Sequence, residues 1–226
     1  MQKPFLILIS IVLVVGAGFF LLQQQPKEVT EPKNGGQIDE NGTKNVQDLT
    51  KEELLLSLKE AAEADDYALF AKYLKAADEQ GWYKEADFQK VESAAYIKAD
   101  QTYFIPGDYN KTLEVSTLVY NAVPQGWRFL YLRVLALEKL GRLDLEGNDL
   151  EGAKEYALTI LRMVFRTEGA NLLADVYIEK IEGSLEAQNK TEAQEFLDYI
   201  WDFEVSEERR EQLIELKEQI KGLFTT

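Results

Sequence analysis

Residues 93–126 read SAAYIKADQTYFIPGDYNKTLEVSTLVYNAVPQG and set the expected architecture of the whole chain. Tyr96, Ala99 and Tyr103 recur at helical spacing, so they share one face of a first helix. The sequence Pro-Gly-Asp at 106–108 breaks that helix, because proline and glycine interrupt helical geometry. The stretch therefore predicts two antiparallel helices joined by a tight turn.

The second helix of this pair is expected to begin at Tyr109 and to end before Pro124. Thr112, Ser116 and Val119 place small side chains along one of its faces, which lets a neighbouring helix approach closely. The stretch is 34 residues long, with an aromatic residue near its start, a Gly-Asp-Tyr turn and a proline near its end. In these features it resembles one tetratricopeptide (TPR) repeat. The resemblance implies an all-α fold in which antiparallel helical hairpins stack as a short right-handed array.

Two further units extend this resemblance over about 84–203. The equivalent small residues Thr112, Ala153 and Ala193 lie 41 and 40 residues apart, which is 34 plus seven and 34 plus six. The extra residues fall near the turn inside each repeat, where longer loops or longer helices cost little. The expected repeats are 84–126, 127–167 and 168–205.

The segments on either side of these repeats are also predicted to be helical. Thr50 and Glu53 form a capping box at the start of an N-terminal hairpin, 49–81, whose second helix covers about 66–80 and which lies outside the register of the repeat. Ser206 is expected to cap a last amphipathic helix, 206–223, that closes the core of the array. No stretch alternates with the period of two that a strand requires.

The composition excludes several classes of function. The chain has 226 residues, of which 40 are acidic and 25 basic, giving a net charge of -15. This charge repels nucleic acid and anionic lipid, so neither is an expected partner of the main domain. The absence of cysteine and histidine excludes disulfides, zinc sites built on these ligands and nucleophilic chemistry that uses them. We expect no cofactor.

The N-terminal residues predict a membrane anchor. Residues 4–22 carry no charge, and eighteen helical residues at about 1.5 Å each span the hydrocarbon core of a bilayer. Lys3 keeps the tail 1–3 in the cytoplasm and places the helical domain, 49–226, outside, in the cell envelope. Residues 23–48 are expected to be a disordered tether. A signal peptide cleaved at Val15-Gly16-Ala17, or a buried soluble helix, is the alternative.

The resemblance to TPR proteins also implies a groove lined by the first helix of each repeat, which binds a protein or peptide. Side chains spaced along these helices would make the contacts. By register, the residues that face this groove are Gln101, Phe104, Arg128, Tyr131, Glu138, Asn171 and Asp175. For any one of them, a role in packing is the alternative.

The segment DLEGNDLEGAKE, from Asp144 to Glu155, is the strongest candidate for a metal site. Asp144, Glu146, Asn148 and Glu155 occupy alternating positions of a calcium loop that ends in an acid. The sixth position requires glycine for a sharp turn but is Asp149. The alternative is a solvated turn in which Asn148 or Asp149 caps the next helix.

We therefore expect a non-catalytic, membrane-anchored extracytoplasmic TPR-like adaptor that binds a protein partner. A structural subunit of a cell-surface or secretion assembly, which associates with copies of itself, is the second hypothesis. An envelope polysaccharide hydrolase that uses paired carboxylates, with Asp144 and Glu155 as the residues to truncate, is the third.

Overall fold

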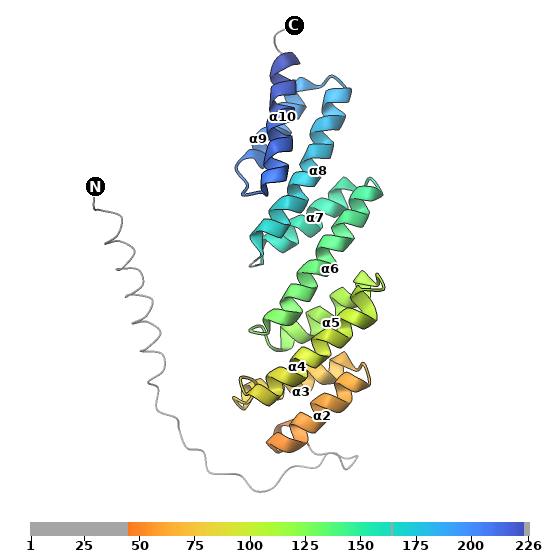
Figure 1. Cartoon of the computed structure of the whole chain (residues 1–226), viewed down its shortest axis with the longest axis vertical. Helices are drawn as coiled ribbons and strands as arrows, with labels where there is room; N and C mark the ends of the chain where they lie inside the picture. The colour runs from red at the N-terminus through yellow and green to blue at the C-terminus, as the bar shows by residue number, and fades with distance from the viewer. Residues whose placement is uncertain (1–44, 164, 224–226) are drawn as a thin grey trace, which may run out of the picture. The chain divides into compact units, whose positions relative to one another are not determined.

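Helices make up all of the regular structure in residues 45–163 and 165–223, the part of the chain that the computed structural model describes. The all-α fold class is confirmed for this part. The expected anchor, 4–22, and the tether as far as residue 44 lie outside it. None of the described helices is long and apolar enough to span a bilayer. In chain order the helices are η1 (Val46–Asp48), α2 (Lys51–Glu63), α3 (Tyr67–Glu79), α4 (Ala86–Ala99), η2 (Asp100–Phe104), α5 (Tyr109–Ala122), α6 (Trp127–Glu146), α7 (Leu150–Leu161), α8 (Arg166–Glu186), α9 (Lys190–Trp201) and α10 (Glu207–Leu223) (Figure 1).

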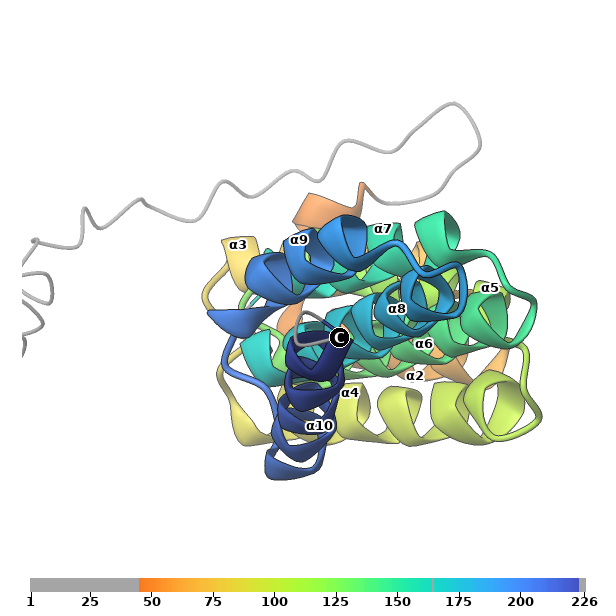
Figure 2. The ribbon, with the colours of Figure 1, turned by 90° about the horizontal axis from the view of Figure 1, so that it is seen from above.

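These helices pack in two layers. In the first layer α2 contacts α4, α4 contacts α6, α6 contacts α8, and α8 contacts α10. The second layer holds α3, α5, α7 and α9. Each of them packs on the helix before it in the chain, α5 through the π-helical extension of α4. Viewed along the array, α3, α7 and α9 lie on the side opposite to α4 and α10 (Figure 2). Each helix is therefore held mainly by elements close to it in the sequence.

Four of the turns between the two layers have the same geometry. In each turn, the residue before the N-cap of the second helix has a positive φ, which is 57–62° in three turns and 94° at the glycine of the fourth. The N-cap itself is Asp or Asn, and its side chain accepts a hydrogen bond from the backbone N–H three residues later. The left-handed residues are Asp65, Gly107, Asn148 and Gln188, and the caps are Asp66, Asp108, Asp149 and Asn189. The caps lie 42, 41 and 40 residues apart. The N-terminal hairpin therefore shares the period of the others, contrary to the expectation from its sequence.

Several expected helix ends are confirmed. Thr50 and Glu53 form the predicted capping box, with Thr50 N donating to Glu53 Oε2 over 2.9 Å and Glu53 N donating to Thr50 Oγ1 over 3.2 Å. The second helix begins at Tyr67, after the side-chain cap of Asp66. Tyr109 begins α5 after the break at 106–108, as predicted.

One expected helix cap was wrong, and two helix ends differ in detail from the expectation. The first helix of the central hairpin ends in the π-helical turn η2. There the backbone N–H of Ile105 donates to the carbonyl oxygen of Asp100, with 2.9 Å between nitrogen and oxygen. Ser206 does not cap α10 through its side chain, because its Oγ is buried without a hydrogen-bond partner among the described residues. Its carbonyl accepts from Arg210 N over 2.9 Å instead. The residues expected as an insertion before α7 mostly continue α6 to Glu146.

The core consists of two clusters that meet at α6. Phe70, Phe88 and Phe129 are fully buried in the first cluster, which α2 to α5 build with the start of α6. The second cluster begins at Val134 and extends to Ile220 in α10. Because α6 contributes side chains to both clusters, its N-terminal half fixes the first hairpins and its C-terminal half the last ones. Burial of such apolar side chains is the main stabilising term of the array.

Candidate functional site

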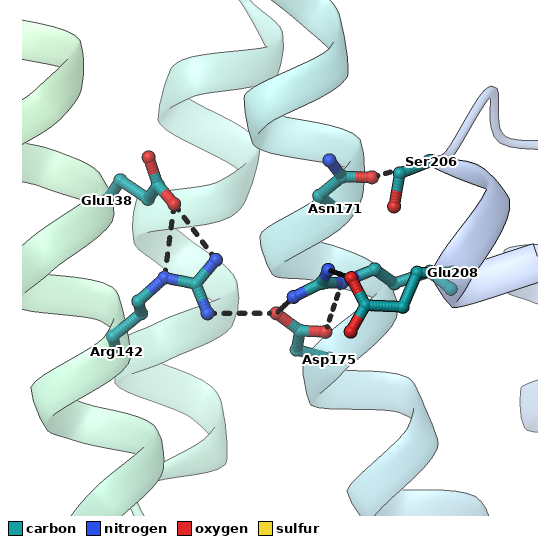
Figure 3. Close-up of polar contacts among 7 residues, drawn as sticks. Glu138, Arg142, Asn171, Asp175, Ser206 and Glu208 are labelled. Carbon is teal, nitrogen blue, oxygen red and sulfur yellow. Dashed lines mark hydrogen bonds and ion pairs between the residues drawn. The ribbon is translucent and has the colours of Figure 1, made fainter. Parts of the chain in front are cut away.

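All seven residues predicted to line a groove lie on helices of the first layer or on η2, which continues α4. The structure brings three of them together and separates the other four. Glu138 on α6 and Asn171 and Asp175 on α8 face the start of α10 (Figure 3).

Asp175 lies at the centre of an ion-pair network that joins α6, α8 and α10. Its Oδ2 is 3.2 Å from Arg142 Nη1, and its Oδ1 is 3.0 Å from Arg209 Nε. Arg142 also pairs with Glu138 over 2.9 Å, and Arg209 with Glu208. The hydrogen bond with Asp175 raises the pKa of Arg209 above its ordinary value. The network therefore fastens α10 to the rest of the array.

Asn171 acts beside this network. Its Oδ1 accepts a hydrogen bond from the backbone N–H of Ser206 over 2.7 Å, at the point where α10 begins (Figure 3). Glu138, Asn171 and Asp175 are thus engaged by partners within the chain. Asn171 and Asp175 contact the start of α10 directly, and Glu138 binds Arg142, which pairs with Asp175; this arrangement fits the packing alternative for these three residues.

The other four predicted residues do not converge on one place. Gln101 is exposed on η2, and the ring of Phe104 packs against Tyr109 at 5.4 Å. The ring of Tyr131 packs against Phe165 at 5.7 Å. Arg128 turns inward, to a carboxylate described next. No single groove gathers these side chains.

A buried carboxylate on α4, which the sequence analysis did not identify, is the partner of Arg128. The side chain of Glu92 is 1% exposed, and its Oε2 lies 3.1 Å from both Arg128 Nη1 and Tyr83 Oη. Its Oε1 is buried without a hydrogen-bond partner within the described chain. Burial raises the pKa of Glu92, while Tyr83 and Arg128 lower it in part. The cluster attaches the N-terminus of α6 to α4.

An open pocket lies between α2 and α4. It has a volume of about 480 Å³, and Leu55, Ala62, Val91 and Ala94 give it apolar walls. Charged side chains complete its lining: Lys59, Lys90 and Lys98, with Glu63 and Asp87. We refer to it as the α2–α4 pocket.

The lysines of the α2–α4 pocket differ in their partners. Lys90 pairs with Asp87 over 3.3 Å, and Lys98 with Asp65 over 3.1 Å. Lys98 also donates to the carbonyl of Ala62 over 3.0 Å, at the C-terminus of α2. Lys59 is exposed and has no ion pair with any described residue. Glu63, four positions after Lys59 on α2, likewise has no ion pair with a described residue, so the lining keeps one unpaired lysine and one unpaired glutamate.

The acidic segment 144–155 adopts the capping alternative. Asp144 and Glu146 lie in the last turn of α6, and Asp149 Oδ1 accepts from Gly152 N over 2.9 Å, which caps α7. Partial burial and the charge of Asp149 raise the pKa of Asp144. Within 45–163 and 165–223, no three carboxylates are placed to hold a metal ion together.

No known protein family matches the chain, and neither a curated protein nor a solved structure is similar to it.

Proposed function

We propose that the protein is a TPR-like helical-repeat scaffold that binds a protein partner and is held at a membrane by residues 4–22. The α2–α4 pocket is the observation that carries this proposal. It combines apolar walls with an unpaired lysine on an open surface. The four equivalent turns and the two helix layers support the repeat architecture. In this proposal the helical domain is extracytoplasmic and performs no catalysis.

The lining of the α2–α4 pocket indicates which partner fits it. A volume of about 480 Å³ can hold one or two bulky apolar side chains, which gain free energy when their surface leaves water. Lys59 can pair with an acidic group beside such a side chain, because it has no described ion-pair partner. The proposed ligand is therefore a segment of a protein that carries a bulky apolar residue next to aspartate or glutamate.

The test is photo-crosslinking in cells from position 94, followed by mass spectrometry of the crosslinked peptide. Ala94 is exposed on α4 and lines the pocket, so a probe can replace it without disturbing the core. We expect a peptide of another protein with an apolar residue beside acidic ones. Recovery of only the protein's own peptides would contradict the proposal and favour the self-assembling subunit.

A matched pair of charge reversals shows whether this capture depends on the pocket. Lys59 and Lys72 are both exposed and have no ion pair with a described residue, but Lys72 lies on α3 in the other layer. K59E should abolish capture from position 94, and K72E should leave it unchanged. Equal effects of the two variants would show that net charge, rather than the pocket, governs capture.

The anchor is tested separately by membrane fractionation of the full chain. We expect the chain to sediment with membranes and to resist extraction at high pH, because only detergent releases a spanning helix. A chain without residues 4–22 should remain in the supernatant. A full chain that is released at high pH would contradict the anchor and leave the proposal for the pocket unchanged.

A further inference from the structure

The arginines divide into two groups by their partners. The chain has seven arginines, all from position 128 onward. Four of them bind carboxylates or backbone carbonyls: Arg128, Arg142, Arg209 and Arg210. The other three, Arg133, Arg162 and Arg166, have no ion pair with a described residue. In a chain with fifteen more acidic than basic residues, three unpaired arginines in one region are unexpected.

Two of these arginines line a second pocket, where α5 and α6 meet the junction of α7 and α8. The pocket has a volume of about 410 Å³, and Tyr120, Leu130, Arg162, Met163 and Arg166 line it. Arg162 and Arg166 are exposed, so their guanidinium groups are open to solvent. Leu130 and Met163 supply apolar surface beside them. We call this the arginine pocket.

Arg133 lies beside the same pocket. Its guanidinium stands over the ring of Tyr120, with its carbon 5.9 Å from the ring centroid. Its Nε is buried and has no hydrogen-bond partner within the described chain. A buried donor without a partner costs free energy, and structures usually satisfy such groups. Because this Nε is closed to solvent, Arg133 adds unpaired positive charge beside the pocket but no donor within it.

Two acidic residues share a neighbouring pocket with Arg166 but form no ion pair with it. Arg166 also lines a neighbouring pocket of about 320 Å³, together with Asp202 and Glu204. Neither carboxylate forms an ion pair with Arg166. Because both are exposed, solvent screens their attraction for the guanidinium. The arginine pocket therefore keeps a local excess of positive charge.

We propose that the arginine pocket binds an acidic side chain of a protein partner, with an adjacent apolar residue on Leu130 and Met163. The planar guanidinium of Arg162 or Arg166 can hold a carboxylate through two parallel N–H donors. A peptide carboxylate can bind within the pocket, whose lining holds two arginines and no acidic residue, whereas an anionic bilayer would also meet the surrounding surface of a chain with a net charge of -15. This inference adds a second contact to the proposed function and uses a pocket apart from the α2–α4 pocket.

The experiment titrates the K59E variant of the full chain, in which the α2–α4 pocket lacks its unpaired lysine, in detergent with a fluorescein-labelled peptide in which glutamate alternates with leucine. A peptide with glutamine in place of glutamate is the matched control ligand. We expect the glutamate peptide to bind at least tenfold more tightly than its control, as read by fluorescence anisotropy. Equal binding of the two peptides, or no binding of either, would overturn the proposal.

Variants then locate the binding site. R162Q and R166Q remove the charges without placing an acid at the C-terminus of α7, and K72Q removes an exposed charge from α3. Each arginine variant should weaken binding of the glutamate peptide about tenfold, which corresponds to 1.4 kcal/mol. K72Q should leave it unchanged. If all three variants lost the same affinity for the glutamate peptide, or if the arginine variants lost none, the assignment of the binding site to the arginine pocket would be overturned.

Nuclear magnetic resonance of the arginine Nε–H groups provides a readout at individual residues. On addition of the glutamate peptide, the signals of Arg133, Arg162 and Arg166 should shift, while the paired Arg142 and Arg209 should not. Shifts with vesicles of phosphatidylserine but not with the peptide would overturn the proposal in favour of a lipid headgroup. Because K59E leaves the arginine pocket intact, failure here is distinguishable from failure of the α2–α4 pocket.

Discussion

Replacement of Arg128 by methionine should destabilise the array in a manner that depends on pH. Methionine keeps much of the length of the arginine side chain but removes the charge that pairs with Glu92. The side chain of Glu92 is 1% exposed and that of Arg128 is 22% exposed, so the carboxylate cannot turn to water as the guanidinium can. The variant therefore leaves a buried charge without its partner, which is among the most costly single changes.

The loss of folding stability in R128M has an upper limit, because Glu92 can take up a proton and so remove the unpaired charge. Protonating a carboxyl group costs about 1.4 kcal/mol for each pH unit above its pKa. With the ordinary pKa of 4.5, the cost at pH 7 is roughly 3 kcal/mol. At pH 5 the same limit is roughly 0.7 kcal/mol. We expect R128M to lose up to about 3 kcal/mol at pH 7 and less than about 1 kcal/mol at pH 5.

The sign of the pH dependence follows from the raised pKa of Glu92. The folded state binds this proton more tightly than the unfolded chain does, so stability from this group is full at low pH. This contribution of Glu92 to stability is lost as the pH rises above 4.5 and through the higher pKa of the folded state. R128M removes a group that lowers this pKa, so the loss extends to higher pH and becomes larger.

The assay is urea unfolding followed by circular dichroism at pH 5 and pH 7, for the wild type, R128M and the double variant E92Q/R128M. Glutamine carries no charge, so the double variant should recover most of the stability that R128M loses at pH 7. A loss in R128M that is the same at both pH values would refute the reasoning. So would a double variant no more stable than R128M, since the burial of charge would then not be the cause.

Four further predictions follow from close contacts, a helix cap and an ion-pair network, and the same unfolding assay measures the change in stability of each variant. A Cβ on Gly169 would lie 2.7 Å from the backbone nitrogen of Leu161, so G169A should cost about 1–3 kcal/mol. In the same helix nothing lies within 4 Å of a Cβ on Gly183, so G183A should stabilise by about 0.5–1 kcal/mol, and a loss there would contradict the argument from space. D149A should cost about 1 kcal/mol through loss of the cap of α7, and an unchanged stability would show that the cap contributes nothing. D175A should cost about 1.5–3 kcal/mol and should expose α10 to proteases, because two arginines lose their shared carboxylate; a uniform pattern of cleavage would contradict this role.

Local signals in the sequence predicted local structure well. The capping box at Thr50 and the start of α5 at Tyr109 depend on residues within one helical turn, so their chemistry is legible in the chain. The shared geometry of the four turns was harder to recognise. Left-handed residues are usually glycine, but three of these four positions hold Asp65, Asn148 and Gln188. The sequence of the first hairpin therefore did not reveal that its turn has the same geometry and spacing as the other three.

Contacts between distant residues were not legible in the same way. Glu92 lies four residues after Phe88 and three before Ala95, so helical spacing places it on the buried stripe of α4. This position on the buried stripe was the signal in the sequence that could have identified a buried carboxylate. Nothing local identified its partner, because Arg128 is 36 residues away. Asp175 similarly meets Arg209 across 34 residues, because α10 folds back onto α8. Only the packed structure shows that these charges are used within the chain.

The most direct test of the account is a charge exchange across the α2–α4 pocket. The partner segment recovered by crosslinking from position 94 is synthesised, and its affinity is measured by calorimetry for the wild type, K59E and K72E. We predict that K59E weakens binding tenfold or more, that K72E does not, and that a segment with lysine in place of its acidic residue restores binding to K59E alone. Equal binding of the original segment to all three proteins would contradict the claim that this pocket recognises the partner.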